Sequence, residues 1–374
     1  MKWLQNGNLA KLVAFFVIAV VITCTVSFAA NGWQSFINNE PDSDDVVADK
    51  NNADSDNIDE KPDGDKTEED VPVVLPTPKY YHVITGLETD LESSLKRPLA
   101  LCFGASDPLY GISSSYLTIE FPTEYGNTRF LCFTDDAKTL GKIGSLTPSR
   151  GYISNLATYF GGVLLSYGLD DRFEYDYKEP HDRLDFAETN GYCYTEYNSF
   201  VYTNGDLVNA FLNNTRINMA SSEKCTLPYI FTEPEKTLNM KGDNASAISV
   251  TFSENNSTQL NYSTTDKCYI LSKNSVAKND LLNDKPLKYD NVFILYANST
   301  TYETEEDTQL ILDTYTKGSG LYASEGVYTE ISWEKDASGN LVFYNLEGGK
   351  LTVNRGTSYI SFVKASSKSS VKIS

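Results

Sequence analysis

The sequence predicts an α+β multidomain protein, with an N-terminal α/β domain followed by a β-rich, sandwich-like or barrel-like domain. A membrane anchor and a disordered acidic linker precede both. Three observations predict this class: an uncharged apolar run near the N-terminus, an acidic stretch after it, and many short apolar runs separated by turn signals. We predict a short cytoplasmic end, an anchor or signal sequence, a linker, an α/β domain, a β-rich domain and a loose tail, at residues 1–11, 12–30, 31–78, 79–240, 241–364 and 365–374.

The apolar run at 12–30 is long enough to cross a bilayer. Lys2 and Lys11 precede it, which favours a cytoplasmic N-terminus and a retained anchor. Two alternatives stay open. Ser27-Phe28-Ala29 has the small residues of a signal-peptide cleavage site, and Cys24 ends a stretch similar to a lipoprotein acylation site. All three place the bulk of the chain outside the cytoplasmic membrane, so we expect an extracytoplasmic protein at the cell membrane.

Residues 40–70 carry 14 Asp and Glu against three Lys, within a chain whose net charge is −20. Almost nothing in this stretch is apolar, so it cannot bury enough surface to offset the entropy of ordering, and we expect a disordered tether. Its acidic spacing does not match a calcium-binding loop. The chain has no basic stripe, which argues against nucleic-acid binding.

Strands and helices alternate in the first folded half, which predicts an α/β layer. Thr147 is a candidate N-cap, and Pro148 a first-turn proline, for a helix ending at Phe160. A second helix is expected over 206–213, capped by Asn204 or Gly205. Apolar and β-branched residues predict strands at 97–103, 116–121, 128–133 and 163–167.

The second folded half has many short strands and no long helix, which is typical of a sandwich or barrel. Turn signals containing glycine separate the strands. The predicted strands lie at 247–252, 259–262, 268–271, 291–296, 309–312, 326–333, 341–344, 349–353 and 357–363.

Acidic and basic side chains gather around the turn between the second and third predicted strands. Loops at strand ends are where α/β folds usually bind ligands. The candidate ligand-binding residues are Glu120, Glu124, Thr128, Arg129 and Arg150. Three interpretations stay open: a buried Arg–Glu network that stabilises the fold, a ligand site, and acid–base catalysis by the two glutamates if their carboxyl groups converge.

Other reactive residues give weaker signals. The chain has two histidines, of which His181 could pair with Cys193 or an acid, and no motif for a nucleotide or an α/β-hydrolase site. An export context permits a disulfide between Cys102 and Cys132, although a cysteine in an apolar strand is usually a small core residue. We expect no metal site and no cofactor.

A series of short motifs, taken in order, resembles the YerB-like lipoprotein family. These motifs are Thr85-Gly-Leu87, Lys96-Arg-Pro-Leu-Ala100, Glu120, Glu124-Tyr-Gly-Asn-Thr-Arg-Phe130, Lys142-Ile-Gly144, Arg150, Asn291-Val292, Gly318-Ser-Gly320, Trp333 with Lys335, and Asn354-Arg-Gly-Thr-Ser-Tyr-Ile360. The resemblance spans about residues 80–364. It implies an exported, membrane-tethered bacterial protein with two domains and no assigned biochemical activity.

This chain departs from the family pattern at three positions. Thr147 stands where relatives tend to have an arginine, and Ser166 and Ser199 stand where they tend to have histidines. If those residues carry a function in the family, this member has altered or lost it.

We therefore expect a non-enzymatic binding or scaffolding protein of the bacterial envelope, with a cell-wall component or another envelope protein as its partner. The alternative is a hydrolase or transferase acting on cell-wall glycan or peptide, with Glu120 and Glu124 as the catalytic acids beside Arg129 and Arg150. A third interpretation is a degenerate member that only contacts another envelope protein.

Overall fold

The computed structural model describes residues 78–135, 139–168, 183–185, 191–196, 199–215, 217–220, 225–303, 308–314 and 316–374. The predicted cytoplasmic end, anchor and acidic linker lie outside these residues, and so does His181. No helix within the described ranges is both long and apolar enough to span a membrane. Residues 75–374 form one compact unit.

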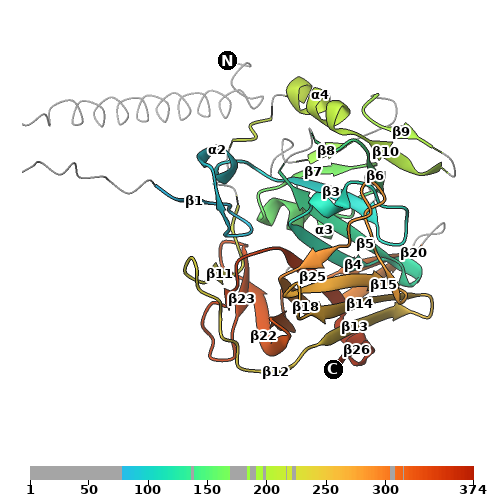
Figure 1. Ribbon diagram of the computed structural model, residues 1–374. Coiled ribbons are helices and arrows are strands. Elements are labelled where there is room, and N and C mark those ends of the chain that lie inside the picture. Colours follow the sequence, from blue (N-terminus) through green and yellow to red (C-terminus); the bar gives the residue numbers. More distant parts are fainter. Residues whose placement is uncertain are drawn as a thin grey trace, which may run out of the picture. The chain divides into compact units, whose positions relative to one another are not determined.

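The unit is β-rich with few helices (Figure 1). Its α-helices are α2 (Leu91–Ser94), α3 (Gly151–Tyr159) and α4 (Gly205–Thr215). The strands of the first half are β1 (Tyr80–Tyr81), β2 (Glu88–Thr89), β3 (Leu99–Gly104), β4 (Leu117–Pro122), β5 (Thr128–Thr134), β6 (Ile143–Leu146), β7 (Val163–Ser166), β8 (Arg183–Asp185), β9 (Tyr194–Thr195), β10 (Val201–Thr203) and β11 (Ile230–Phe231).

The second half adds fifteen strands among the described residues. They are β12 (Asp243–Asn244), β13 (Ala247–Ser253), β14 (Asn256–Ser263), β15 (Cys268–Lys273), β16 (Val276–Ala277), β17 (Lys288–Tyr289), β18 (Asn291–Ala297), β19 (Ser299–Glu303), β20 (Thr308–Leu312), β21 (Lys317–Ser324), β22 (Val327–Lys335), β23 (Leu341–Tyr344), β24 (Thr352–Val353), β25 (Ser358–Lys364) and β26 (Val371–Ile373).

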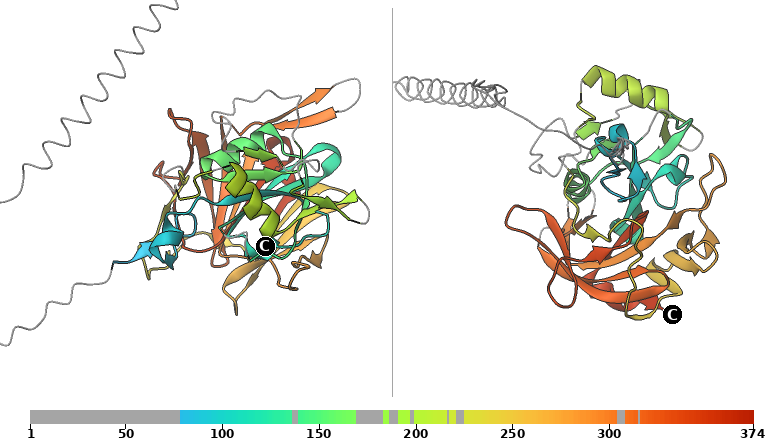
Figure 2. Two further views of the ribbon diagram at one scale, coloured as in Figure 1. Left: turned by 90° about the horizontal axis from the view of Figure 1, so that it is seen from above. Right: turned by 60° about the vertical axis from the view of Figure 1, so that its left-hand side comes forward.

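One large sheet runs through both halves of the chain, in the order β12-β22-β21-β18-β25-β4-β5-β3-β6-β10-β9. The late strand β25 lies between β18 and β4 and is parallel to both. Figure 2 shows the last strands of the chain, in orange and red, gathered at the end of the unit away from α4. The predicted boundary near residue 240 stays a prediction, and this sheet continues across it.

A second sheet packs against one face of the large one. It has the order β16-β15-β14-β13-β26, with β17 beside β15. Phe103 and Phe130 of the large sheet share a buried core with Val250, Leu260 and Leu271 of the smaller sheet. Each of these strands turns alternate residues inward, so burial of the apolar set joins the two sheets face to face.

The opposite face of the large sheet is covered by α3 and by the segment around Tyr229. Ile153 and Leu156 of α3 pack with Leu117 and Ile119 of β4 in a second buried core. The large sheet is therefore the middle layer, with apolar side chains on both of its faces.

The expected N-terminal α/β domain is not confirmed. The pair β3 and β7 is parallel, with α3 in the connection between them, but most pairings in the large sheet are antiparallel. The helix predicted from Thr147 begins instead at Gly151, with Arg150 as its N-cap residue. The backbone N–H of Thr147 donates to the carbonyl of Cys102 at 3.0 Å, which keeps the chain extended after β6. Asn204 caps α4 by accepting from the N–H of Leu207 at 3.0 Å.

The last residues, expected to be loose, are ordered. Residues 365–370 form a 3-10 helix, and β26 then pairs with β13. Val371 and Ile373 are partly buried against the core between the sheets, which explains why this mostly polar segment packs against the smaller sheet.

The five cysteines among the described residues are free thiols. Cys102 lies opposite Leu131 on the neighbouring strand, and Cys132 lies opposite Leu101. The two cysteines are thus one position out of register, and they face the two different cores. This geometry prevents the disulfide that the export context permits.

Candidate functional site

The alternation of β4 decides where Glu120 points. Leu117, Ile119 and Phe121 face the core beneath α3, so Thr118 and Glu120 face the space between the two sheets. Glu120 is completely buried. A buried carboxylate is tolerated only when charge and hydrogen bonds compensate its lost hydration.

Four side chains bind the carboxylate of Glu120. Its Oε1 accepts from the Thr128 hydroxyl at 2.7 Å and from the Lys273 ammonium at 2.8 Å. Its Oε2 accepts from the Thr258 hydroxyl at 2.8 Å and from the Tyr359 hydroxyl. These partners come from β5, β14, β15 and β25, so the network joins both sheets.

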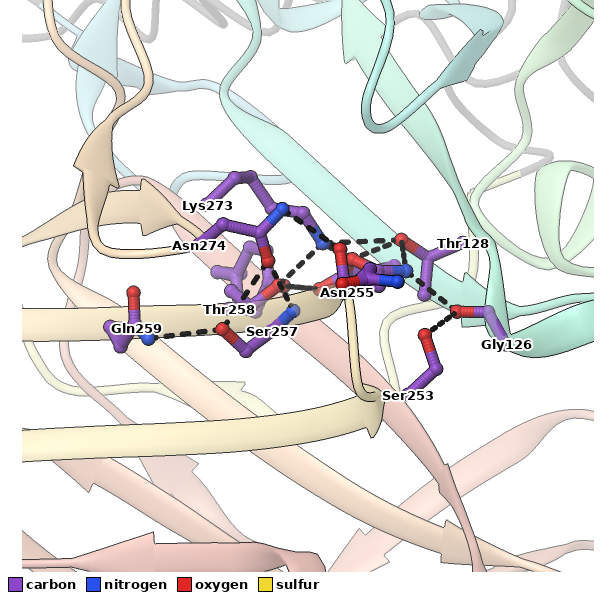
Figure 3. Close-up of polar contacts among 12 residues, drawn as sticks. Gly126, Thr128, Ser253, Asn255, Ser257, Thr258, Gln259, Lys273 and Asn274 are labelled. Atoms are coloured by element: carbon purple, nitrogen blue, oxygen red, sulfur yellow. Dashed lines mark hydrogen bonds and ion pairs between the residues drawn. The ribbon is translucent and has the colours of Figure 1, made fainter.

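The ammonium group of Lys273 donates to three acceptors. Its side chain is only 6% exposed, and it reaches the hydroxyls of Thr258 at 2.9 Å and Thr128 at 3.3 Å in addition to Glu120. Figure 3 shows the contacts of Lys273 with Thr128 and Thr258. Asn256 extends the network by donating to the hydroxyl of Thr128 and to the carbonyl of Gly126.

Tyr359 completes the ring of donors around the carboxylate. Burial raises its pKa well above the ordinary value, and the negative charge of Glu120 raises it further, so the phenol stays a hydrogen-bond donor. The carboxylate is therefore enclosed and saturated with hydrogen bonds. This arrangement favours the buried-network interpretation for Glu120 and Thr128 over a ligand site.

A second cluster holds the other three candidates. Glu124 accepts from the Arg150 guanidinium at 3.0 Å and from the backbone N–H of Leu310 at 3.0 Å. Burial alone would raise the pKa of Glu124, but the hydrogen bond from Arg150 and the backbone hydrogen bonds outweigh it, so the pKa is lowered. The ionised Glu124 thus connects the turn before β5 with the N-terminus of α3 and with strand β20.

Arg129 adds a second guanidinium beside this pair. It donates to the carbonyl of Pro148. Burial lowers its pKa, and the positive charge of Arg150 lowers it further. Arg129 and Arg150 thus place two neighbouring guanidinium groups close to the carboxylate of Glu124.

The structure therefore divides the five predicted residues into two clusters. Glu120 and Glu124 share no hydrogen-bond partner and lie in different surroundings. A pair of converging catalytic carboxylates is not what this geometry favours. Within the described part of the chain, no group of three His, Cys, Asp or Glu lies close enough to hold a metal ion.

Sequence reasoning missed Lys273, Thr258 and Tyr359. The alternation of inward-facing and outward-facing residues along their strands could have identified them. In β15, for example, Tyr269 and Leu271 face inward, which places Lys273 inward as well. A lysine at an inward position of a strand predicts a buried partner of opposite charge.

A further polar cluster surrounds His82. The backbone N–H of Thr85 donates to Nδ1 at 3.1 Å, so Nε2 carries the proton and donates to Asp135 at 2.7 Å. The Tyr116 hydroxyl donates to the same carboxylate at 2.7 Å. Both ring nitrogens are occupied, so His82 fixes the start of the unit and is not available as a base.

Replacing Glu124 with Gln is expected to lower stability more at neutral pH than in acid. Because the folded pKa lies below the unfolded value of about 4.3, the ion pair contributes above the unfolded pKa and is lost as pH falls through the folded pKa. We expect a loss of about 2 kcal/mol near pH 7 and a smaller difference between the two proteins near pH 3. Urea unfolding across this range measures it. A difference that does not change with pH would contradict the assignment.

Comparison with known proteins finds related chains of the same architecture. Residues 248–360 match the family described as "Protein of unknown function (DUF3048) C-terminal domain". "Putative lipoprotein YerB" of Bacillus subtilis (strain 168) is 24% identical over 280 residues, which cover 69% of this chain and 79% of that protein. The crystal structure of the YerB protein from Bacillus subtilis matches with a TM-score of 0.67 and 20% identity, covering 79% of this chain and 100% of that one. These matches confirm the resemblance that the ordered motifs predicted.

Proposed function

Since the chain is a YerB-like protein across both halves of its folded unit, we propose that it is an extracytoplasmic, membrane-tethered binding protein of the bacterial envelope and not an enzyme. The apolar run at 12–30 would serve as the anchor, and the acidic stretch at 40–70 would hold the folded unit away from the membrane surface. The relative YerB is described as a putative lipoprotein, which supports the same location.

The two neighbouring guanidinium groups of Arg129 and Arg150 carry the binding part of this proposal. A guanidinium presents planar, paired donors that match a carboxylate or phosphate. The cluster stands where β5 and α3 begin, beside the exposed ring of Tyr125. We propose that an anionic group of the ligand binds beside these two guanidinium groups.

The hydrolase or transferase alternative has less support. It requires Glu120 and Glu124 to face one substrate, and Glu120 is enclosed between the sheets. The single observation that separates the two functions is therefore the saturated carboxylate of Glu120, with four side-chain donors.

The binding proposal is tested by calorimetric titration of the folded chain with inorganic phosphate and with a short peptide that has a free carboxyl terminus. We expect one of these anions to bind and Arg129→Met to weaken the binding by about tenfold, since a hydrogen bond between charged groups contributes about 1.5 kcal/mol or more. Lys142→Met is the matched control, because Lys142 pairs with Glu196 elsewhere in the unit. Failure of both anions to bind, or equal loss in the two variants, would reject the site.

The tether is tested separately by fractionation of cells that express the full chain or a chain without residues 1–30. The full chain should sediment with the membranes, and the truncated chain should be soluble. Equal distribution of the two proteins between the membrane and soluble fractions would reject the membrane anchor, but it would leave the proposal of an anion-binding site untouched.

A further inference from the structure

Tyr125 has the most exposed aromatic side chain among the residues that the structure describes. The residue is 78% exposed, and the next aromatic residue, Tyr302, is 47% exposed. Tyr125 lies in the short 3-10 turn η3 (Glu124–Gly126) between β4 and β5. A single exposed ring needs no explanation by itself, but the backbone of this residue does.

The backbone of Tyr125 is left-handed, with φ 58° and ψ 23°. In this region the Cβ atom crowds the following carbonyl oxygen, so a bulky side chain is uncommon there, whereas glycine is tolerated freely. Eight non-glycine residues of the described ranges have a positive φ, and Tyr125 is the one aromatic residue among them. The ring is thus retained at a position where glycine would be less strained.

The turn that carries Tyr125 is fixed to both sheets. The N–H of Thr123 donates to the carbonyl of Asn127 at 2.8 Å, which closes the turn. The carbonyl of Gly126 accepts from the Ser253 hydroxyl at 3.2 Å, drawn in Figure 3, and from the Asn256 amide at 2.9 Å. A rigid turn with an exposed ring and a strained backbone is typical of a residue that contacts a ligand.

The neighbouring charges favour a phosphate as the anionic group. Glu124, which precedes Tyr125, contacts the Arg150 guanidinium at 3.0 Å. Burial lowers the pKa of Arg129, and the positive charge of Arg150 lowers it further, so the two guanidinium groups are close enough to repel each other. A phosphate monoester carries about 1.5 to 2 negative charges and three acceptor oxygens. It therefore relieves this repulsion better than a carboxylate, which has one charge and two oxygens.

We propose that this site binds a phosphorylated saccharide, with its phosphate beside Arg129 and Arg150 and one face of its sugar ring on Tyr125. The apolar face of a pyranose presents C–H groups of slight positive charge, and the face of a tyrosine ring is negative. This inference rests on the proposed function, because the phosphate uses the same two guanidinium groups. It adds the chemical class of the ligand.

The test is calorimetric titration of the full chain with glucose 1-phosphate and with inorganic phosphate. Glucose 1-phosphate should bind about fivefold more tightly than inorganic phosphate, because it adds the contact with the ring of Tyr125. Tyr125→Gly should reduce the affinity for glucose 1-phosphate to that for inorganic phosphate, without changing the affinity for inorganic phosphate. Tyr125→Phe, which keeps the ring, should bind both as the unaltered chain does.

Stability separates a ligand contact from a structural role of the ring. Tyr125→Gly should raise the midpoint of urea unfolding, since glycine relieves the left-handed backbone. The matched control is Ser275→Gly, at an exposed, uncharged residue whose φ is 65°. This variant should also raise the midpoint, but it should bind glucose 1-phosphate as the unaltered chain does.

The outcomes distinguish this inference from the proposed function. If neither inorganic phosphate nor the peptide with a free carboxyl terminus binds, the anion site and this inference both fail. If only the peptide binds, or if glucose 1-phosphate binds no more tightly than inorganic phosphate, the anion site stands and the phosphorylated saccharide is overturned. Uridine monophosphate that binds more tightly than glucose 1-phosphate would overturn it in favour of a nucleotide. A lower unfolding midpoint for Tyr125→Gly would overturn it in favour of a structural role.

Discussion

Replacing Glu120 with Ala is expected to destabilise the protein by about 3–5 kcal/mol or to prevent folding, because it leaves the Lys273 ammonium buried without its counter-charge. The hydroxyls of Thr258 and Tyr359 would lose their acceptor as well. Urea unfolding followed by tyrosine fluorescence measures the loss. Glu330→Ala, an exposed acid on β22, is the control and should change stability by less than about 0.5 kcal/mol.

A midpoint that stays the same or rises in Glu120→Ala would mean that this carboxylate is maintained for function at a cost to stability. It would also revive the catalytic alternative for Glu120 and Glu124. The predicted loss would instead establish this residue as a structural connection between the two sheets.

Replacing Asp280 with Ala is expected to have the second largest effect, with a loss of about 3 kcal/mol or more. Asp280 is completely buried and holds the loop before β17 against residues near Ile112. Its carboxylate accepts from the backbone N–H groups of Gly111, Ser113 and Leu282, each at 2.9 Å, and from the Ser113 hydroxyl at 2.6 Å. Removing it leaves the buried N–H of Gly111 and the partly buried donors of Ser113 without a partner, and a buried donor without a partner costs about 1–3 kcal/mol.

The measurement is chemical unfolding of Asp280→Ala beside Glu254→Ala, whose acid is exposed in a turn. Asp280→Asn should lose less than Asp280→Ala, because the amide keeps one acceptor oxygen. Equal stability of Asp280→Ala and the control would show that water replaces the carboxylate at no cost, and the loop contact would then be weak.

Local patterns predicted most of the strands, but not how distant strands pair. β4, β5 and β18 follow from their apolar and β-branched residues. The insertion of β25 between β4 and β18 does not, since nothing within a strand states which distant strand will lie beside it. The α/β expectation arose from the order of elements near α3 and overlooked that most neighbouring strands run antiparallel.

The candidate site at the charged turn stays a prediction, and the different surroundings of its two glutamates could not be predicted from spacing alone. Glu120 follows the alternation of β4 and is directed inward, whereas Glu124 lies in the turn after that strand. The partner Lys273 is 153 residues away from Glu120 in sequence. Only the folded arrangement of the sheets brings these two charges together.

The most direct test of the account is a double-mutant cycle with Glu120→Gln, Lys273→Met and the double variant, measured by urea unfolding. If the ion pair is a structural connection, each single variant loses several kcal/mol and the double variant recovers about 1–3 kcal/mol of the summed loss, because no charge is then left alone in the core. Single variants as stable as the unaltered chain, with no coupling between the positions, would contradict the account and return Glu120 to the candidate catalytic residues.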